Sequence, residues 1–251
     1  MNADAERTFR LVVAYDGTDF AGFQSQPNAR TVQDVLEAAL KTVLKEDRRI
    51  AAAGRTDAGV HALGQVVRVS TTNRIPADRL PVALNRVLPR EVLVRHAALC
   101  DPRFHPRHDA VRRTYRYRID NRSVPDVLSR RYAWHLPTRL DVPRMQIAAD
   151  SLVGTRDFAA FCSAGSWTAS TVRTLMRFDC RRRGADVLIT LAASAFLYRM
   201  VRNVVGTLVA IGRGALPPEA LLEICESRRR DRCSAPAPAR GLTLVGVDYP
   251  E

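Results

Sequence analysis

The sequence predicts an α+β protein built from two related ferredoxin-like halves, each an antiparallel sheet with its helices on one face. Two observations lead to this class. Segments with a hydrophobic period of two alternate with segments of period 3.6, and the order strand, helix, strand, strand, helix, strand can be traced twice. We expect the halves to be domains at residues 1–105 and 106–251, with an active-site cleft between them.

The first half opens with a strand over residues 8–15, TFRLVVAY, in which apolar residues alternate with others. A polar loop with several glycines follows. Thr31 then caps a helix over residues 32–44, with Asp34 at a capping-box-like spacing. Two short strands, a helix and a strand complete the half, at residues 49–53, 64–71, 76–87 and 91–99.

The second half repeats the order of elements without repeating the sequence. It begins with a strand over residues 111–119, and Asp141 caps the helix that follows. The remaining expected elements are a helix at 141–154, a hairpin of 171–180 and 185–193, helices at 196–212 and 217–227, and a closing strand at 241–249.

The charge of the chain favours a polyanionic partner. Its 251 residues carry a formal charge of +13, with 37 arginines against two lysines. Each cation placed on a phosphate releases a condensed counterion, so nucleic acid is the leading class of partner. Arginine abundance from GC-rich coding is the alternative, because the chain is also rich in alanine.

Other classes of protein are disfavoured. No apolar run is long enough to span a membrane and the N-terminus lacks the pattern of a signal peptide, so we expect a cytoplasmic protein without a membrane partner. The five cysteines show no paired spacing and are read as reduced thiols. His105 and His108 have no companion ligands, so no metal site is expected.

The motif GRTDAGVHA places Asp57 in a glycine-flanked turn, two residues after Arg55. The glycine spacing superficially matches a phosphate-binding loop, but Val60 and His61 stand where such a loop needs Lys and Ser or Thr. Nucleotide hydrolysis is therefore disfavoured. A purely structural turn, with Asp57 bonded to local amides, stays open on spacing alone.

Two further stretches suit an RNA-binding enzyme. In a strand over residues 111–119, Arg113, Tyr115 and Tyr117 share one face, and such basic and aromatic residues suit unstacked bases. Alternatively, these tyrosines are ordinary core. Arg202 lies within a helix that is otherwise apolar, so it must reach solvent or meet a carboxylate, for which we assign Asp57.

Five motifs together resemble the TruA family of tRNA pseudouridine synthases, in family order from residue 15 to 250. They are YDGTDFAGFQSQP, GRTDAGVHALGQV, RTYRY, FLYRMVRNVVG and GLTLVGVDYP, of which GRTDAGVHA is the most specific. The resemblance implies isomerisation of uridine to pseudouridine at positions 38 to 40 of the tRNA anticodon stem-loop. It also implies a homodimer that uses no metal and no cofactor.

The resemblance also implies residue roles. Asp57 matches the catalytic aspartate, Arg202 the arginine that pairs with it, and Tyr115 the tyrosine that lies against the uracil. Arg55 matches the arginine associated with drawing the uridine out of its stack, and Leu242 a leucine that adds an apolar wall.

Two positions depart from the commoner family pattern. Phe23 stands where Trp is usual and Arg199 where His is frequent, which puts details of RNA contact in doubt. Asp57 could act as a covalent nucleophile or as a base that removes a sugar proton. A non-catalytic RNA-binding protein or tRNA chaperone on the same scaffold is the alternative function.

Overall fold

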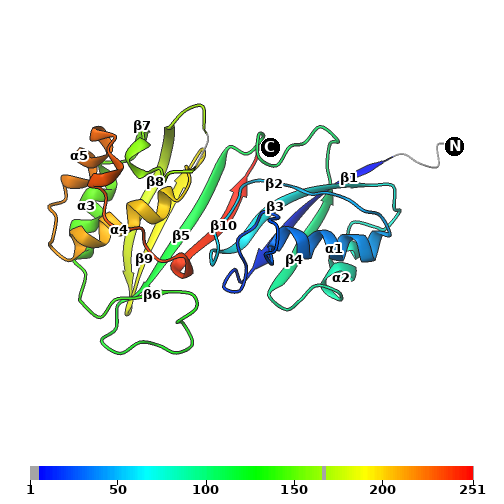
Figure 1. Cartoon of the computed structure of the whole chain (residues 1–251), viewed down its shortest axis with the longest axis horizontal. Coiled ribbons are helices and arrows are strands. Elements are labelled where there is room, and N and C mark those ends of the chain that lie inside the picture. The colour runs from blue at the N-terminus through cyan, green and yellow to red at the C-terminus, as the bar shows by residue number, and fades with distance from the viewer. Residues whose placement is uncertain (1–5, 166–167, 251) are drawn as a thin grey trace. The chain divides into compact units, whose positions relative to one another are not determined.

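The computed structural model describes residues 6–165 and 168–250 (Figure 1). The chain folds into two compact units. Unit 1 holds the residues up to Val111 and those from Leu244 on, and unit 2 holds Arg112–Thr243. Both combine helices with antiparallel strands, which confirms the α+β class. No helix within the described ranges has the length and apolar character needed to cross a bilayer.

Unit 1 has the predicted order of strand, helix, strand, strand, helix, strand. In sequence these elements are β1 (Arg7–Tyr15), α1 (Val32–Leu44), β2 (Ala51–Ala52), β3 (His61–Thr71), α2 (Arg79–Asn85) and β4 (Val92–Leu99). Their sheet runs β4-β1-β3 with β2 also on β3, and each of these pairs is antiparallel. The final strand β10 (Leu242–Asp248) neighbours β3 as well.

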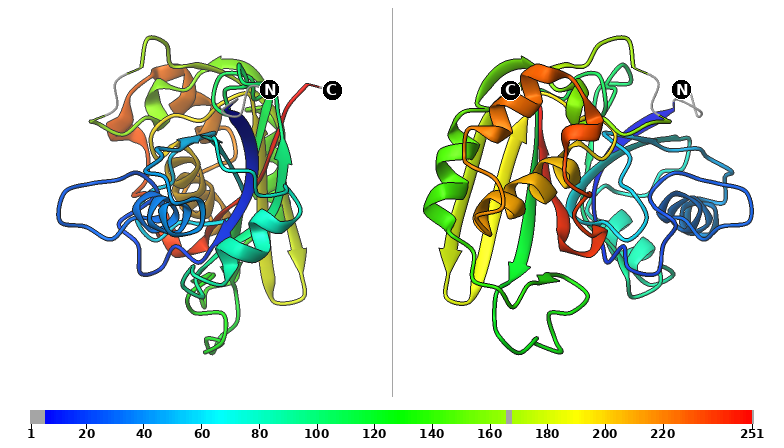
Figure 2. Two further views of the ribbon diagram at one scale, coloured as in Figure 1. Left: turned by 90° about the vertical axis from the view of Figure 1, so that its right-hand side faces the viewer. Right: turned by 60° about the vertical axis from the view of Figure 1, so that its left-hand side comes forward.

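The core of unit 1 lies between this sheet and its two helices, which contact each other (Figures 1 and 2). Strand β1 explains the arrangement, because its alternate residues Phe9, Leu11 and Val13 are fully buried while Arg10 between them is half-buried. From α1, Leu36 and Leu40 fill the same core. One face of the sheet therefore packs against helices, and Arg10 belongs to the other.

Thr31 begins α1 as expected. Its hydroxyl oxygen accepts a hydrogen bond from the Asp34 backbone amide at 3.2 Å, and the hydroxyl proton is directed to the Asp34 carboxylate at 2.5 Å. The helix ends at Lys45, whose left-handed conformation has a φ of 62°. The cap thus satisfies an amide that the first turn would leave without a partner.

Unit 2 contains the remaining strands and helices. Its helices and strands are β5 (Arg112–Asp120), β6 (Trp134–His135), α3 (Val142–Asp150), β7 (Gly154–Asp157), β8 (Val172–Arg183), β9 (Asp186–Ala193), α4 (Met200–Gly212) and α5 (Ala220–Ser227). Short 3₁₀ turns occupy Ala159–Phe161, Arg230–Arg232 and Ala239–Gly241. The sheet runs β5-β9-β8-β7 with antiparallel pairs, and β6 lies parallel to β5.

Most of the predicted elements of unit 2 are confirmed, including the β8–β9 hairpin and the Asp141 cap of α3, which accepts from the Arg144 amide at 3.1 Å. The start of α4 was predicted wrongly. The helix begins at Met200 and not at residue 196, because Arg199 takes a left-handed conformation with φ of 56°. In addition, the amide of Ser163 bonds the Tyr198 carbonyl at 3.1 Å, which ties the preceding segment to a loop.

The cap of α1 can be tested with Thr31→Val, which keeps the shape of this buried side chain and removes its hydroxyl. We expect the free energy of unfolding to fall by about 1 kcal/mol, since the Asp34 amide loses its acceptor. Urea denaturation measures the change. The control is Thr42→Val, at an exposed position of the same helix, where no loss beyond about 0.5 kcal/mol is expected. Equal losses in both variants would contradict the role of the cap.

Candidate functional site

Asp57 lies in the segment that joins β2 to β3. The buried Thr56 stands between the exposed Arg55 and the half-buried Asp57. The Thr56 hydroxyl shares a hydrogen bond of 2.8 Å with the hydroxyl of Tyr15, at the end of β1, and both side chains are buried. The loop is therefore anchored by its middle residue, which leaves Arg55 and Asp57 nearer the solvent.

The turn after Asp57 explains one glycine of the motif. The amide of Val60 donates to the Asp57 carbonyl at 3.1 Å, which closes a four-residue turn. Gly59 holds its third position with φ of 76°, a conformation that favours glycine. Asp57 thus takes part in a tight turn, as the structural interpretation expected, and this turn fixes where its carboxylate starts from the backbone.

The polar loop of residues 16–23 packs against the Asp57 loop. The Phe23 amide donates to the Thr56 carbonyl at 3.0 Å, and the Gly59 amide to the Phe20 carbonyl at 3.3 Å. A Cβ on Gly22 would lie 2.8 Å from the Thr56 carbonyl oxygen, and one on Gly17 2.0 Å from that of Val60. The two loops touch through their backbones, so glycine is required at both positions.

Phe23 belongs to this support. Its ring is 2% exposed and lies 6.2 Å from the Tyr15 ring, measured between centroids. The departure from the family pattern at Phe23 put details of RNA contact in doubt. The ring is instead buried against Tyr15, so it acts on the Asp57 loop from within unit 1.

Burial raises the pKa of Tyr15 to about 12, although the bonds from Thr56 and Gln65 act in the opposite direction. Gln65 is itself fully buried and donates to the carbonyl of Gly54, the first residue of the motif, at 2.8 Å. The neutral tyrosine is therefore the form that fits this site. The supporting roles of Tyr15, Thr56 and Gln65 were not predicted, because nothing in the sequence marks a cluster of buried polar side chains.

Tyr115 and Tyr117 differ although they share a face of β5. Tyr117 is fully buried and its hydroxyl donates to the Pro238 carbonyl at 2.7 Å, so the core interpretation holds for it. Tyr115 is half-buried, with the Phe196 ring edge-on at 5.0 Å between centroids. Arg112 and Arg116 on the other face are exposed. Tyr115 is thus the tyrosine that a ligand can reach.

Arg202 lies in the first turn of α4 and is half-buried. Its Nε donates to the Ala237 carbonyl at 2.8 Å, and the Ala237 amide donates back to the Arg202 carbonyl at 2.9 Å. One turn later, a Cβ on Gly206 would lie 2.0 Å from the Ala235 carbonyl oxygen. The segment 235–237 therefore packs directly on α4 and fixes the stem of Arg202.

The residues on either side of Arg202 in the motif have separate roles. Asn203 is fully buried, donates to the Phe161 carbonyl at 2.7 Å and accepts from Arg230 at 2.9 Å. Arg199 is exposed, lies before the helix and has its guanidinium 5.0 Å from the centre of the Tyr198 ring. Leu242, at the start of β10, is 5% exposed.

The predicted site residues thus fall into two groups. Arg55 and Asp57 share one loop of unit 1, and Tyr115, Arg202 and Leu242 belong to unit 2. No group of three or more His, Cys, Asp or Glu side chains suited to a metal ion is found among the residues that the structure describes. Unit 1 offers a carboxylate on a backbone-anchored loop with an exposed guanidinium nearby, and unit 2 offers a half-buried aromatic ring and a half-buried guanidinium.

The chain is similar to known proteins along nearly its whole length. A family described as tRNA pseudouridine synthase matches residues 11–109 and 148–250. The tRNA pseudouridine synthase A of Moorella thermoacetica is 48% identical over 96% of this chain and 98% of its own. The proteins of the same name from Brevibacillus brevis and Methylobacterium nodulans are both 46% identical, over 97% of this chain and 100% and 96% of theirs.

Among solved structures, the archaeal box H/ACA sRNP Nop10-Cbf5 complex aligns with a TM-score of 0.34 and 12% identity. The alignment covers 80% of this chain and 44% of that one. This likeness is too weak to bear on fold or function.

The anchor of the Asp57 loop can be tested with Tyr15→Phe. At neutral pH we expect the free energy of unfolding to fall by about 1 kcal/mol, because Thr56 loses a buried partner. At alkaline pH we expect the stability of the wild type to fall more steeply with pH than that of the variant. The folded pKa of about 12 exceeds the ordinary value of 10.0, so the wild type loses stability as pH rises from 10 towards 12.

The loss due to Tyr15 is of order 2 to 3 kcal/mol, and it should be absent from the variant. Denaturant titrations at a series of pH values compare the slopes. Tyr198→Phe, at an exposed tyrosine, serves as the control and should follow the wild type. A Tyr15→Phe curve parallel to that of the wild type above pH 10 would refute the account.

Proposed function

Because this chain belongs to the tRNA pseudouridine synthase family, we propose that Asp57 is the carboxylate with which it isomerises uridines of the anticodon stem-loop, at positions 38 to 40. The chain is an isomerase that acts on tRNA. The proposal for Asp57 is carried by one observation: its carboxylate lies half-buried on a loop held by the buried bond between Tyr15 and Thr56.

The reaction explains why a single carboxylate can suffice. Isomerisation breaks the glycosidic bond at N1, turns the uracil while it stays bound, and joins C5 to the ribose, from which the C5 hydrogen then leaves. Nothing is oxidised or added. In our proposal Asp57 acts on the ribose, either as a covalent nucleophile or as a base that takes a sugar proton.

Arg202 would pair with Asp57 and favour its ionised form, as a neighbouring cation does. The observation in support is the fixed stem of Arg202, whose Nε is already bound to the Ala237 carbonyl at 2.8 Å. The two terminal nitrogens of the guanidinium can then make the parallel pair of bonds that a carboxylate accepts.

The remaining residues would handle the base. A uridine inside a helix is out of reach, so it must leave the stack at a cost of a few kcal/mol. Arg55, exposed beside Asp57, would fill the vacancy. The reachable ring of Tyr115 would lie against the detached uracil, and Leu242 would add an apolar wall.

We infer further that the enzyme is a homodimer and works in the cytoplasm, where tRNA is modified. An L-shaped substrate can lie in the cleft of one subunit and on the basic surface of the other. The many arginines outside the motifs support this. The comparisons give no support to a non-catalytic RNA-binding protein or tRNA chaperone.

The role of Asp57 is tested by tritium release from tRNA transcripts that carry 5-tritiated uridine, without added metal or nucleotide. We expect Asp57→Asn to abolish release and to leave the Kd for tRNA within a few-fold, because the amide keeps the shape but cannot ionise. Asp101→Asn, at an exposed aspartate bonded to Arg103, should keep full activity. An Asp57→Asn protein that loses binding as severely as turnover would refute the assignment.

The homodimer is tested by analytical ultracentrifugation at micromolar protein concentration. We expect sedimentation at twice the 27.9 kDa mass of the chain, with and without tRNA. A single species at the mass of one chain in both conditions would remove the second subunit from the proposal.

A further inference from the structure

Two arginines stand directly opposite each other in the sheet of unit 1. Arg10 of β1 and Arg68 of β3 are register partners, on the face that α1 and α2 do not cover. Like charges in this relation destabilise a sheet. Within the described ranges neither side chain forms an ion pair, and Arg68 Nε is shielded from solvent without a hydrogen-bond partner. Such a donor is costly unless an acceptor arrives.

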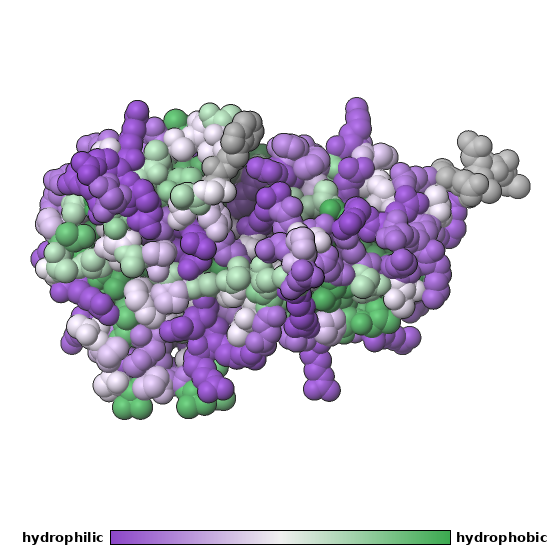
Figure 3. All heavy atoms as spheres, viewed as in Figure 1, coloured by the Kyte–Doolittle hydropathy of each residue, from purple (hydrophilic) through white to green (hydrophobic). Residues whose placement is uncertain are grey.

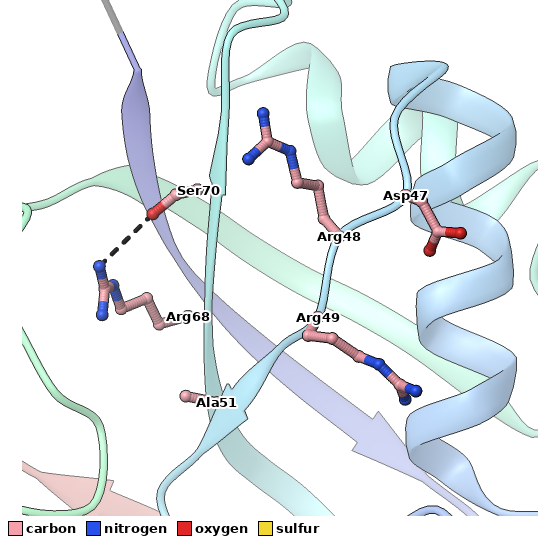
Figure 4. Close-up of a pocket in the computed structure, with 6 residues that line it drawn as sticks. All are labelled: Asp47, Arg48, Arg49, Ala51, Arg68 and Ser70. Atoms are coloured by element: carbon pink, nitrogen blue, oxygen red, sulfur yellow. Dashed lines mark hydrogen bonds between the residues drawn. The ribbon is translucent and has the colours of Figure 1, made fainter.

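Arg68 borders a pocket of about 310 Å³ (Figure 4). The other lining residues are Asp47, Arg48, Arg49, Ala51 and Ser70. Ala51 is the register partner of Arg68 on β2, and its small side chain leaves space beside the guanidinium. Figure 4 shows Arg68 extending away from α1, towards the Ser70 hydroxyl, which it approaches at 3.5 Å.

The other charges of the pocket already have partners. Asp47 pairs with Lys41 at 3.0 Å, Arg48 with Glu46 at 2.7 Å, and Arg49 with Glu37 at 2.9 Å. The Arg49 side chain accordingly reaches towards α1 (Figure 4). Arg68 and its register partner Arg10 are therefore the charged residues here without a carboxylate partner among the described residues. Two adjacent guanidinium groups without a carboxylate match the charge and the donor geometry of a phosphate.

The charge of Arg68 also reaches its neighbours. It contributes to lowering the pKa of His105, after burial and His108, and it opposes the rise in the pKa of Cys100 that burial causes. Arg10 acts on Cys100 in the same way, and its guanidinium lies 5.7 Å from the centre of the Tyr249 ring. The positive potential of the pair is thus felt across this face of the unit.

We propose that Arg10 and Arg68 together bind one backbone phosphate of the tRNA substrate, at a contact separate from the Asp57 loop. The inference rests on the proposed function for the identity of the substrate arm. Arg68 follows His61, the residue at the Asp57 end of β3, by seven positions, or about 23 Å of strand. Arg68 also lies three positions from Gln65 on β3, and therefore on the opposite face of the sheet from the residue that supports that loop. The phosphate therefore belongs to a part of the tRNA outside the anticodon arm.

The test compares full-length tRNA with an isolated anticodon stem-loop, by equilibrium binding over a range of salt concentrations. For Arg68→Ala we expect the Kd for full-length tRNA to rise about three- to tenfold, and the slope of log K against log salt to fall by about one. Binding of the stem-loop should not change. The double variant of Arg10→Ala and Arg68→Ala should resemble the single variants, because both side chains serve one phosphate.

Arg79→Ala is the matched control, since it removes the same charge from an exposed position of unit 1, on α2. Thermal melts identify any variant that has lost its fold, in which case Arg68→Gln is measured instead. Equal losses for both RNAs, an equal loss in Arg79→Ala, or an unchanged Kd for full-length tRNA would each overturn the proposal. Competition of inorganic phosphate with tRNA at this pair only in the wild type would support it.

The outcome is independent of turnover. If the wild type released no tritium from positions 38 to 40, the proposed function would fail, while the binding comparison would still decide whether Arg10 and Arg68 contact the tRNA.

Discussion

The hydrogen bond between Tyr15 and Thr56 is the constraint on which the geometry around Asp57 depends. It joins the last residue of β1 to the middle of a loop that has little regular structure of its own. Because both hydroxyl groups are buried, each needs the other as a partner. The backbone from which the Asp57 carboxylate extends is thereby fixed. Such preorganisation suits the catalytic role that we propose for Asp57.

In unit 2, backbone contacts position the side chain of Arg202. Arg202 and Ala237 exchange two hydrogen bonds, and Gly206 lets the segment 235–237 approach α4 closely. The Nε of this long side chain is thus fixed by the backbone of a segment distant in sequence. In both units the residues proposed for chemistry are supported by neighbours that take no part in it, and the support comes from segments distant in sequence.

Periodicity and capping residues predicted most elements, because local sequence determines them. Thr31 and Asp141 mark their helices through hydrogen bonds to the first turn, and β1 reveals its core face by alternation. The start of α4 could not be predicted, because the Tyr198 carbonyl is bonded by the distant Ser163 amide and Arg199 takes a left-handed conformation. Strand β6 has two residues and β7 four, too few to show a period.

The candidate site residues also include features that the sequence predicts and features that only the structure reveals. The motif around Asp57 is specific enough to be noticed, and the arrangement of Tyr115 and Tyr117 on one face follows from strand geometry. Of these two tyrosines, Tyr117 is the buried one, and its hydroxyl bonds the carbonyl of Pro238, more than a hundred residues later in the chain. Tertiary burial of this kind leaves no trace in local sequence, which is why Tyr15 and Thr56 also went unnoticed.

The close backbone approaches at Gly17, Gly22 and Gly206 affect how this enzyme can change by mutation. Every amino acid other than glycine carries a Cβ, so any single-base change of a glycine codon that alters the residue introduces one. Every missense change at these three positions therefore forces apart segments that support Asp57 or Arg202. Single mutations can thus inactivate the enzyme at positions whose role is to let two backbone segments approach each other closely.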